Sequence, residues 1–379
     1  MAIKNSSFVF GVSVADYNYI PRVEETRLLK MNFEEGINTI LISPRRWGKT
    51  SLVQHVCKVL DKENTIPVYV DIFGCKNEYD FYNTLVEAIL KQTANKTQLW
   101  MENAKEFLAR LTPQISISPE PMSDIKISLG ITPKTHSPEE ILQLAENIAI
   151  KKDKRLVICI DEFQQIGEMP DSLAIQKKLR SVWQHQKCVS YCLFGSKKHM
   201  MSEIFQNKKM PLYQFGDMHF LEKIPTEEWK KYIVGHFNDR KRVISDEFAQ
   251  QIVAEVNGYS SYVQQLAWHV FSLLDEGETV TKDHINNAMR NLLNSCELLF
   301  MQQTESLTEY QMNFLRAIAS GVHANFGEQK IREKYNLGSA SNITRLRAAL
   351  IRTELIESDG RKINIVDPIF EKWFGMRFL

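Results

Sequence analysis

The chain contains 379 residues, and at about 150 residues per domain this length predicts two or three domains with full hydrophobic cores. With 44% hydrophobic and 25% charged residues, the composition is that of an ordinary globular protein and excludes a small disulfide scaffold or a low-complexity chain. The formal net charge is only +1, so no overall field attracts DNA, RNA or an anionic membrane, and any such partner must be held by a local patch.

The sequence favours an intracellular location. Its six cysteines form no C-x-x-C motif and no pairing pattern, which is typical of reduced thiols in a cytoplasmic protein. No run of about 18 apolar residues is present, and the first residues lack the apolar segment of a secretory signal. We therefore expect a cytoplasmic protein without a membrane span.

The first part of the chain has the pattern of an α/β fold. Short apolar, β-branched runs alternate with amphipathic helical stretches, which predicts a parallel sheet with helices on both faces. The middle runs are apolar nearly throughout, as strands buried on both faces must be. The five predicted strands are Asn38–Ser43, Ile66–Phe73, Arg155–Ile160, Val189–Phe194 and Asp217–Leu221.

Further domains follow this α/β part, which we place at residues 1–224. Within it, the periodicity lapses over about residues 95–137, where we expect an inserted loop or hairpin. Residues 225–304 show only helical periodicity and predict a separate all-α domain, which we interpret as a lid.

Residues 305–379 predict a winged helix-turn-helix domain. Helices are expected over Glu309–Ser320, Glu328–Tyr335 and Ser339–Thr353. Two short strands then flank an Asp-Gly pair, which is a strong signal for a hairpin turn. Three helices followed by a hairpin form the winged helix. The predicted strands are Leu355–Ser358 and Lys362–Val366.

A phosphate-binding motif follows the first predicted strand. Residues 43–50 match G-x-x-x-x-G-K-[ST], except that Ser43 replaces the first glycine. Backbone N–H groups at a helix N-terminus bind phosphates, Lys49 supplies a charge to the β- and γ-phosphates, and the Thr50 hydroxyl can ligate Mg²⁺. The alternative is a basic turn with solvated side chains. The loop residues expected to bind nucleotide are Pro44, Arg45, Arg46, Trp47, Gly48, Lys49, Thr50 and Ser51.

A second motif supports the first. The apolar strand Arg155–Ile160 runs into Asp161 and Glu162, which is the Walker B arrangement. Asp161 would hold the Mg²⁺ hydration shell, and Glu162 would polarise the attacking water. Two acids at a strand end can also be a solvated turn, but their pairing with a phosphate loop favours catalysis.

Ser196 is a third candidate, because it follows the strand Val189–Phe194 in a Gly-Ser pair. If this strand lies beside the Walker B strand, Ser196 could sense the γ-phosphate or position the water; otherwise the pair is an ordinary turn. No N-K-x-D motif for guanine is present, so ATP is the favoured nucleotide.

At this point the chain resembles the archaeal-type ATPase family, a branch of the AAA+ and STAND-related P-loop ATPases. The resemblance rests on Pro44–Thr50, the Asp-Glu pair at 161–162, the Gly-Ser pair at 195–196 and Pro211-Leu212-Tyr213. It implies a P-loop ATPase domain, a helical lid and a winged helix, but no substrate. It also implies that Ile20 and Arg22, in the element before the first strand, contact the nucleotide.

One position departs from the family pattern. Many relatives have an arginine after the Pro-Leu-Tyr segment, whereas Gln214, Phe215 and Gly216 stand here. A positive charge that stabilises the transition state is therefore missing at this place. Arg180 and Arg46 are the alternative sources within the chain.

The winged helix offers a candidate output surface. At 100° per residue, Ser341, Arg345 and Arg352 share the exposed face of the third helix. This face suits a DNA major groove, but residues 301–379 hold eleven Lys and Arg against nine Asp and Glu, so a protein partner is favoured over duplex DNA.

Three functions remain open from the sequence. The first is an ATPase that converts ATP and water to ADP and phosphate and acts as a nucleotide-driven switch. The second is an ATP-dependent DNA- or protein-binding module with little hydrolysis. A nucleoside kinase is the third, although it needs neither Glu162 nor a winged helix. An oligomer is compatible with all three.

Overall fold

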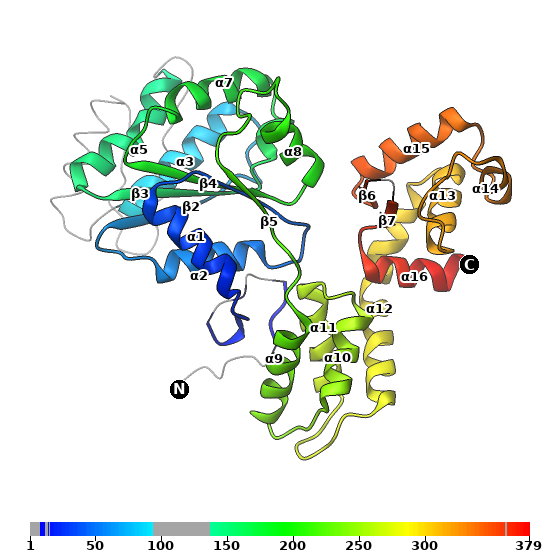
Figure 1. Cartoon of the computed structure of the whole chain (residues 1–379). Coiled ribbons are helices and arrows are strands. Elements are labelled where there is room, and N and C mark those ends of the chain that lie inside the picture. Colours follow the sequence, from blue (N-terminus) through cyan, green and yellow to red (C-terminus); the bar gives the residue numbers. More distant parts are fainter. Residues whose placement is uncertain (1–7, 12–13, 15, 94–136, 361) are drawn as a thin grey trace. The chain divides into compact units, whose positions relative to one another are not determined.

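The computed structural model of the protein describes residues 8–11, 14, 16–93, 137–360 and 362–379 (Figure 1). The chain forms two compact units. One is Gly11–Ile224, and the other is Pro225–Leu379 together with the first ten residues of the chain. Phe8, Val9 and Phe10 thus belong with the helical part rather than with the α/β part.

The first unit is built on the predicted parallel sheet. All five strands are present, and they pair in the order β2-β3-β4-β1-β5 with every pair parallel. The prediction of an α/β fold is therefore confirmed. The strands are β1 Thr39–Ile42, β2 Thr65–Asp71, β3 Arg155–Asp161, β4 Val189–Gly195 and β5 Asp217–Phe220.

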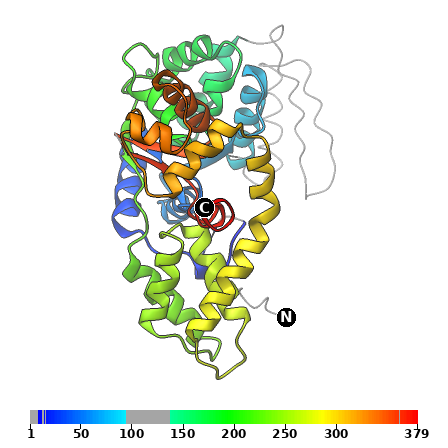
Figure 2. The same cartoon turned by 90° about the vertical axis from the view of Figure 1, so that its right-hand side faces the viewer.

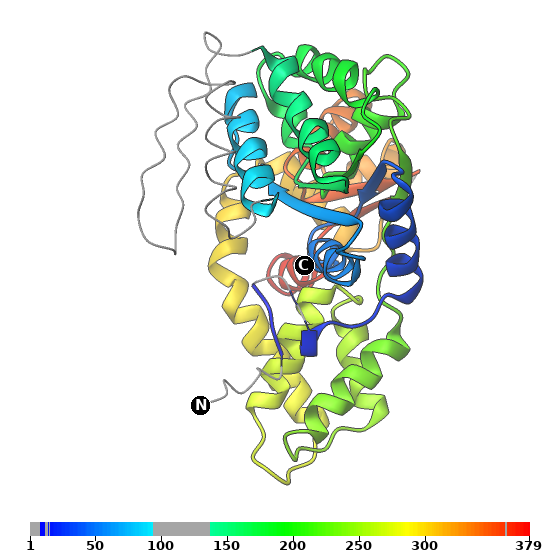
Figure 3. The same cartoon turned by 90° about the vertical axis from the view of Figure 1, so that its left-hand side faces the viewer.

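Helices cover both faces of this sheet (Figure 1). On one face, α1 and α2 pack through Phe33 and Leu52 against Leu41 of β1. The other face carries α3, α5, α7 and α8, and Figure 3 shows β2 at the sheet edge beside α3. The helices are α1 Val23–Glu35, α2 Lys49–Val59, α3 Glu78–Thr93, α5 Pro138–Lys152, α6 Gln165–Glu168, α7 Ser172–Trp183 and α8 Lys198–Gln206.

The predicted insertion at 95–137 lies outside the described residues, except for its last residue. Ser137 is the N-cap of α5 and forms a capping box with Glu140.

The second unit begins with four helices, of which α12 is the longest (yellow in Figure 2). Trp229 of α9 and Ile285 of α12 are buried. The helices are α9 Thr226–Asn238, α10 Asp246–Glu255, α11 Ser260–Ser272 and α12 Lys282–Glu305.

The predicted winged helix elements follow in order. The hairpin strands β6 and β7 are antiparallel and pair Ile356 with Ile365. Leu346 and Leu350 of α15 are buried. The elements are α13 Glu309–Ala319, α14 Gln329–Lys334, α15 Ala340–Arg352, β6 Ile356–Asp359, β7 Lys362–Ile365 and α16 Pro368–Phe378.

The final helix, α16, was not predicted. Asp367 caps it by accepting hydrogen bonds from the backbone N–H groups of residues 369 and 370, and proline occupies its first turn. Phe370 and Trp373 pack on Phe300 of α12, with ring centroids 5.3 Å and 5.5 Å away. The Asp-Pro pair was the signal in the sequence that could have revealed this helix.

None of the helices that the structure describes has the length and apolarity needed to cross a membrane.

Phe8 explains why the start of the chain belongs to the second unit. Its side chain is buried, and its ring centroid lies 5.8 Å from those of Phe237 and Phe271. The backbone N–H of Val9 donates to Oε1 of Gln264. One residue from the beginning of the chain thus completes an aromatic core formed by α9 and α11.

We expect Phe8→Ala to lower the free energy of unfolding of this unit by about 3–5 kcal/mol, because it removes a buried aromatic ring and leaves a cavity. Denaturant unfolding monitored by circular dichroism measures this change. Phe10→Ala is the matched control, since Phe10 is exposed and its loss should change stability little. Equal effects of the two substitutions would contradict the packing of Phe8.

Candidate active site

The phosphate loop joins β1 to α2. Its left-handed backbone positions are Arg46, with φ of 69°, and Gly48, with φ of 89°. Ser43 is buried and is not among the described residues with positive φ. The replacement of glycine by serine at position 43 therefore causes no backbone strain. Gly48 is the N-cap of α2, and Lys49 is the first residue of the helix.

Lys49 is a buried cation beside two carboxylates. Its side chain is only 7% exposed, and Nζ lies 3.7 Å from Oδ1 of Asp161 and 4.0 Å from Oε1 of Glu162. The sheet order places β1 and β3 on either side of β4, so the loop after β1 and the acids after β3 lie at the same edge. A buried charge needs such partners.

Asp161 is held by three donors. Thr50 Oγ1 donates to Oδ2 over 2.8 Å, as does the hydroxyl of Tyr69 from the neighbouring strand β2. The backbone N–H of Glu162 donates to Oδ1. Burial and the adjacent Asp161 raise the pKa of Tyr69, so its hydroxyl remains a donor. Sequence reasoning missed Tyr69 because its contact depends on the pairing of β2 with β3.

The Asp161 and Thr50 oxygens fit Mg²⁺. Magnesium prefers hard oxygen ligands and is usually held by one or two carboxylates together with water and phosphate oxygens. The described residues contain no group of three or more His, Cys, Asp or Glu side chains able to hold a metal by themselves.

Glu162 stands in an unusual backbone conformation, with φ of 56°. Its Oε2 accepts hydrogen bonds from Ser196 Oγ, at 3.3 Å, and from Nε2 of Gln164. Arg45 Nε lies 3.5 Å from Ser196 Oγ, where it donates a long hydrogen bond. β3 pairs with β4, as the role expected for Ser196 requires. Left-handed backbone at a non-glycine residue is costly and is concentrated at functional sites.

Arg22 donates hydrogen bonds to the backbone of the phosphate loop and of the segment after β5. Its side chain is 3% exposed, Nη2 donates to the carbonyl of Trp47 over 2.9 Å, and Nη1 donates to the carbonyl of Glu222 over 2.8 Å. Burial lowers the pKa of Arg22, and the adjacent Glu25 opposes that shift. These bonds attach the phosphate loop to α1 and to the segment after β5.

The other residues expected to contact the nucleotide differ in their exposure. Ile20 is buried, and Ser51 Oγ accepts a hydrogen bond from the backbone of Val14. Pro44 is half-buried and Arg46 is exposed on the loop surface. The Lys223 ammonium group lies over the Trp47 ring, 5.4 Å from the ring centroid.

Arg180 does not lie beside the phosphate loop. Its guanidinium stacks over the Phe215 ring, 5.4 Å from the centroid. The Phe215 carbonyl accepts from Asn38, which directly precedes β1. Arg180 is therefore at the amino-terminal edge of the sheet, whereas Lys49 follows the carboxyl-terminal edge, so Arg180 cannot stabilise charge at the Lys49 loop of its own chain.

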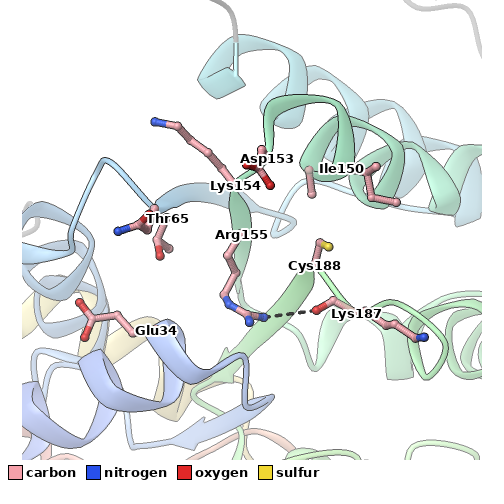
Figure 4. Close-up of a pocket in the computed structure, with 10 residues that line it drawn as sticks. Glu34, Thr65, Ile150, Asp153, Lys154, Arg155, Lys187 and Cys188 are labelled. Atoms are coloured by element: carbon pink, nitrogen blue, oxygen red, sulfur yellow. Dashed lines mark hydrogen bonds between the residues drawn. The ribbon is translucent and has the colours of Figure 1, made fainter.

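A pocket of about 340 Å³ lies at this amino-terminal edge (Figure 4). Arg155 and Lys187 line it together with Asp153 and Glu34, and Arg155 Nη1 donates to the carbonyl of Lys187. Glu34 is already paired with Lys30. Three basic and two acidic residues are among the lining residues, and the Walker residues are not among them. Ligands of open parallel sheets bind at the opposite edge.

Comparisons with known proteins agree with this architecture. The family model described as a probable winged helix domain matches residues 298–376. A Walker-type ATPase of Pyrococcus abyssi matches with a TM-score of 0.70 and 16% identity, covering 97% of this chain and 99% of that chain. The ORC2 protein of Aeropyrum pernix, solved as ADPNP–ADP complexes, matches with a TM-score of 0.60 and 16% identity, covering 96% and 97%. No curated protein matches the sequence.

The strand order, the family model for the C-terminal part and the two full-length structural similarities lead to one conclusion about architecture. The chain has the fold of an AAA+-like P-loop ATPase with a C-terminal winged helix.

Proposed function

We propose that the protein is a Mg-ATP-binding, AAA+-like ATPase that acts as a nucleotide-driven switch, with its output through the helical lid at 225–304 and the winged helix at 305–379. The observation that carries this proposal is the cluster of Lys49, Thr50, Asp161 and Glu162 at one edge of the parallel sheet. The nucleotide complexes of the similar ORC2 protein give further support.

Each residue of the cluster has a distinct role in this proposal. Lys49 and the N–H groups at the start of α2 bind the β- and γ-phosphates. Thr50 and Asp161 hold Mg²⁺, which neutralises charge on the phosphates. Glu162 accepts the proton of the attacking water, and Ser196 donates to the γ-phosphate or to that water.

The alternative is a nucleotide-dependent binding module with little hydrolysis. The missing arginine after Tyr213 and the distant position of Arg180 favour it, because both remove a transition-state charge within the chain. Glu162 favours turnover. Steady-state ATPase activity with and without duplex DNA separates the two functions.

The proposed output surface of the winged helix lies on α15. Ser341, Arg345 and Arg352 are exposed on α15, and Arg345 Nη2 donates to Oδ1 of Asn342. Arg347 instead bonds to Ser358 of the hairpin and holds the wing. Since this region has eleven basic and nine acidic residues, we favour a protein partner over duplex DNA.

Lys49→Ala should abolish measurable ATP affinity, because the site loses the charge aimed at the β- and γ-phosphates. Isothermal titration measures the affinity, and Lys58→Ala, at the exposed end of the same helix, is the control. Unchanged affinity in Lys49→Ala would show that the phosphate site lies elsewhere.

Glu162→Gln should leave ATP binding intact and reduce hydrolysis by roughly 10² or more, because the amide keeps the shape of the side chain but does not accept the proton. Single-turnover assays with labelled ATP measure the rate. Equal turnover would remove Glu162 from the mechanism, and lost binding would make it a structural residue.

Replacing Arg345 and Arg352 with Ala should release a protein partner recovered by pull-down, while ATPase activity and thermal stability stay unchanged. The wild-type chain should have little duplex affinity at physiological salt. Lys282→Ala with Arg290→Ala, two exposed basic residues of α12, is the charge-matched control.

The opposite outcome is tight, salt-dependent duplex binding by the wild-type chain. The Arg345 and Arg352 substitutions would then weaken that binding and lower its salt slope by about one for each lost phosphate contact. This result would show that the winged helix binds duplex DNA and would contradict the proposed protein partner.

A further inference from the structure

Gln164 is a buried amide that contacts Glu162. Its residue exposure is 3%, and Nε2 donates a hydrogen bond to Oε2 of Glu162. Its Oε1 is also buried and has no hydrogen-bond partner within the part of the chain that the structure describes. An unpaired buried acceptor destabilises a fold, so packing stability alone does not account for glutamine at this position.

Gly195 provides the space that Gln164 occupies. A Cβ atom at position 195 would lie 2.0 Å from Gln164 Oε1 and 2.8 Å from Sδ of Met201. Gly195 is not among the described glycines with positive φ, so its strand conformation does not itself need glycine. The requirement for glycine is therefore side-chain clearance, above all that of Gln164, whose Oε1 would lie nearest to the added Cβ.

The two donors together orient the Glu162 carboxylate. Ser196 Oγ and Gln164 Nε2 both bond to Oε2, and Oε1 is left 4.0 Å from Lys49 Nζ. The backbone of Glu162 is in the left-handed region in this arrangement. A general base must be held within hydrogen-bond reach of the water that it activates, so its orientation affects the rate.

We propose that Gln164 is a positioning residue for Glu162 and that Gly195 is glycine because Gln164 needs the space. This inference rests on the proposed ATPase function. Gln164 acts only through the Glu162 carboxylate, and its loss should slow hydrolysis without changing nucleotide affinity.

Gln164→Met tests this proposal, because methionine has a similar volume but cannot donate to a carboxylate. We expect kcat to fall roughly 10–100-fold, with ATP affinity and the unfolding midpoint unchanged. Gln176→Met is the matched control. Gln176 is equally buried, its Nε2 makes one described side-chain bond, to Ser172, and its Oε1 likewise lacks a partner in the described chain. The control should keep the wild-type kcat.

A double-variant cycle separates action through Glu162 from an independent role. Adding Gln164→Met to Glu162→Gln should cause no further loss of rate, because the carboxylate being positioned is already absent. Gly195→Ala should reproduce the loss of kcat seen with Gln164→Met.

Three results would overturn the inference. A wild-type kcat in Gln164→Met, with a wild-type chain that hydrolyses ATP, would contradict the role of Gln164 but leave the ATPase function standing. Absence of hydrolysis by the wild-type chain under single-turnover conditions would remove both. A fully additive loss in the double variant would also show that Gln164 does not act through Glu162.

Discussion

The ion cluster around Lys49 is the constraint on which the rest of the first unit depends. A buried ammonium group between two carboxylates is stable only when the distances are held, because removing one partner leaves an uncompensated charge. Here the holding is done by strand pairing, since β4 lies between the strand of the phosphate loop and the strand of Asp161. The burial of the apolar strands β3 and β4 in the sheet therefore also fixes the distances between the charged groups at the carboxyl ends of the strands.

Backbone support surrounds this cluster. Arg22 fixes the loop through the Trp47 carbonyl, and Tyr69 fixes Asp161 from the side of β2. Both contacts help to set the positions of Lys49 and Asp161. The resemblance to archaeal-type ATPases implies a nucleotide contact for Arg22, and the described hydrogen bonds of its side chain go to Glu25, Glu222 and Trp47.

The strands and the motif residues could be predicted because their periodicity and side-chain chemistry depend on residues that are close together in the sequence. The β3 run is apolar and ends in two acids, so its burial and its function can be inferred together. Tyr69, Gln164 and Gly195 could not be found in this way, because their roles depend on which strands are neighbours and on side-chain clearance. The membership of Phe8 in the helical unit depends likewise on contacts distant in sequence.

The same reasoning explains how the chain can tolerate departures from a motif. Serine is acceptable at position 43 because the loop places its positive φ angles at Arg46 and Gly48 instead. The missing arginine after Tyr213 is different, because no backbone adjustment replaces a positive charge at a developing negative one. Arg45 of the phosphate loop donates to Ser196, which bonds to Glu162, so a cation of the loop is already connected to the carboxylate at which the missing charge would act.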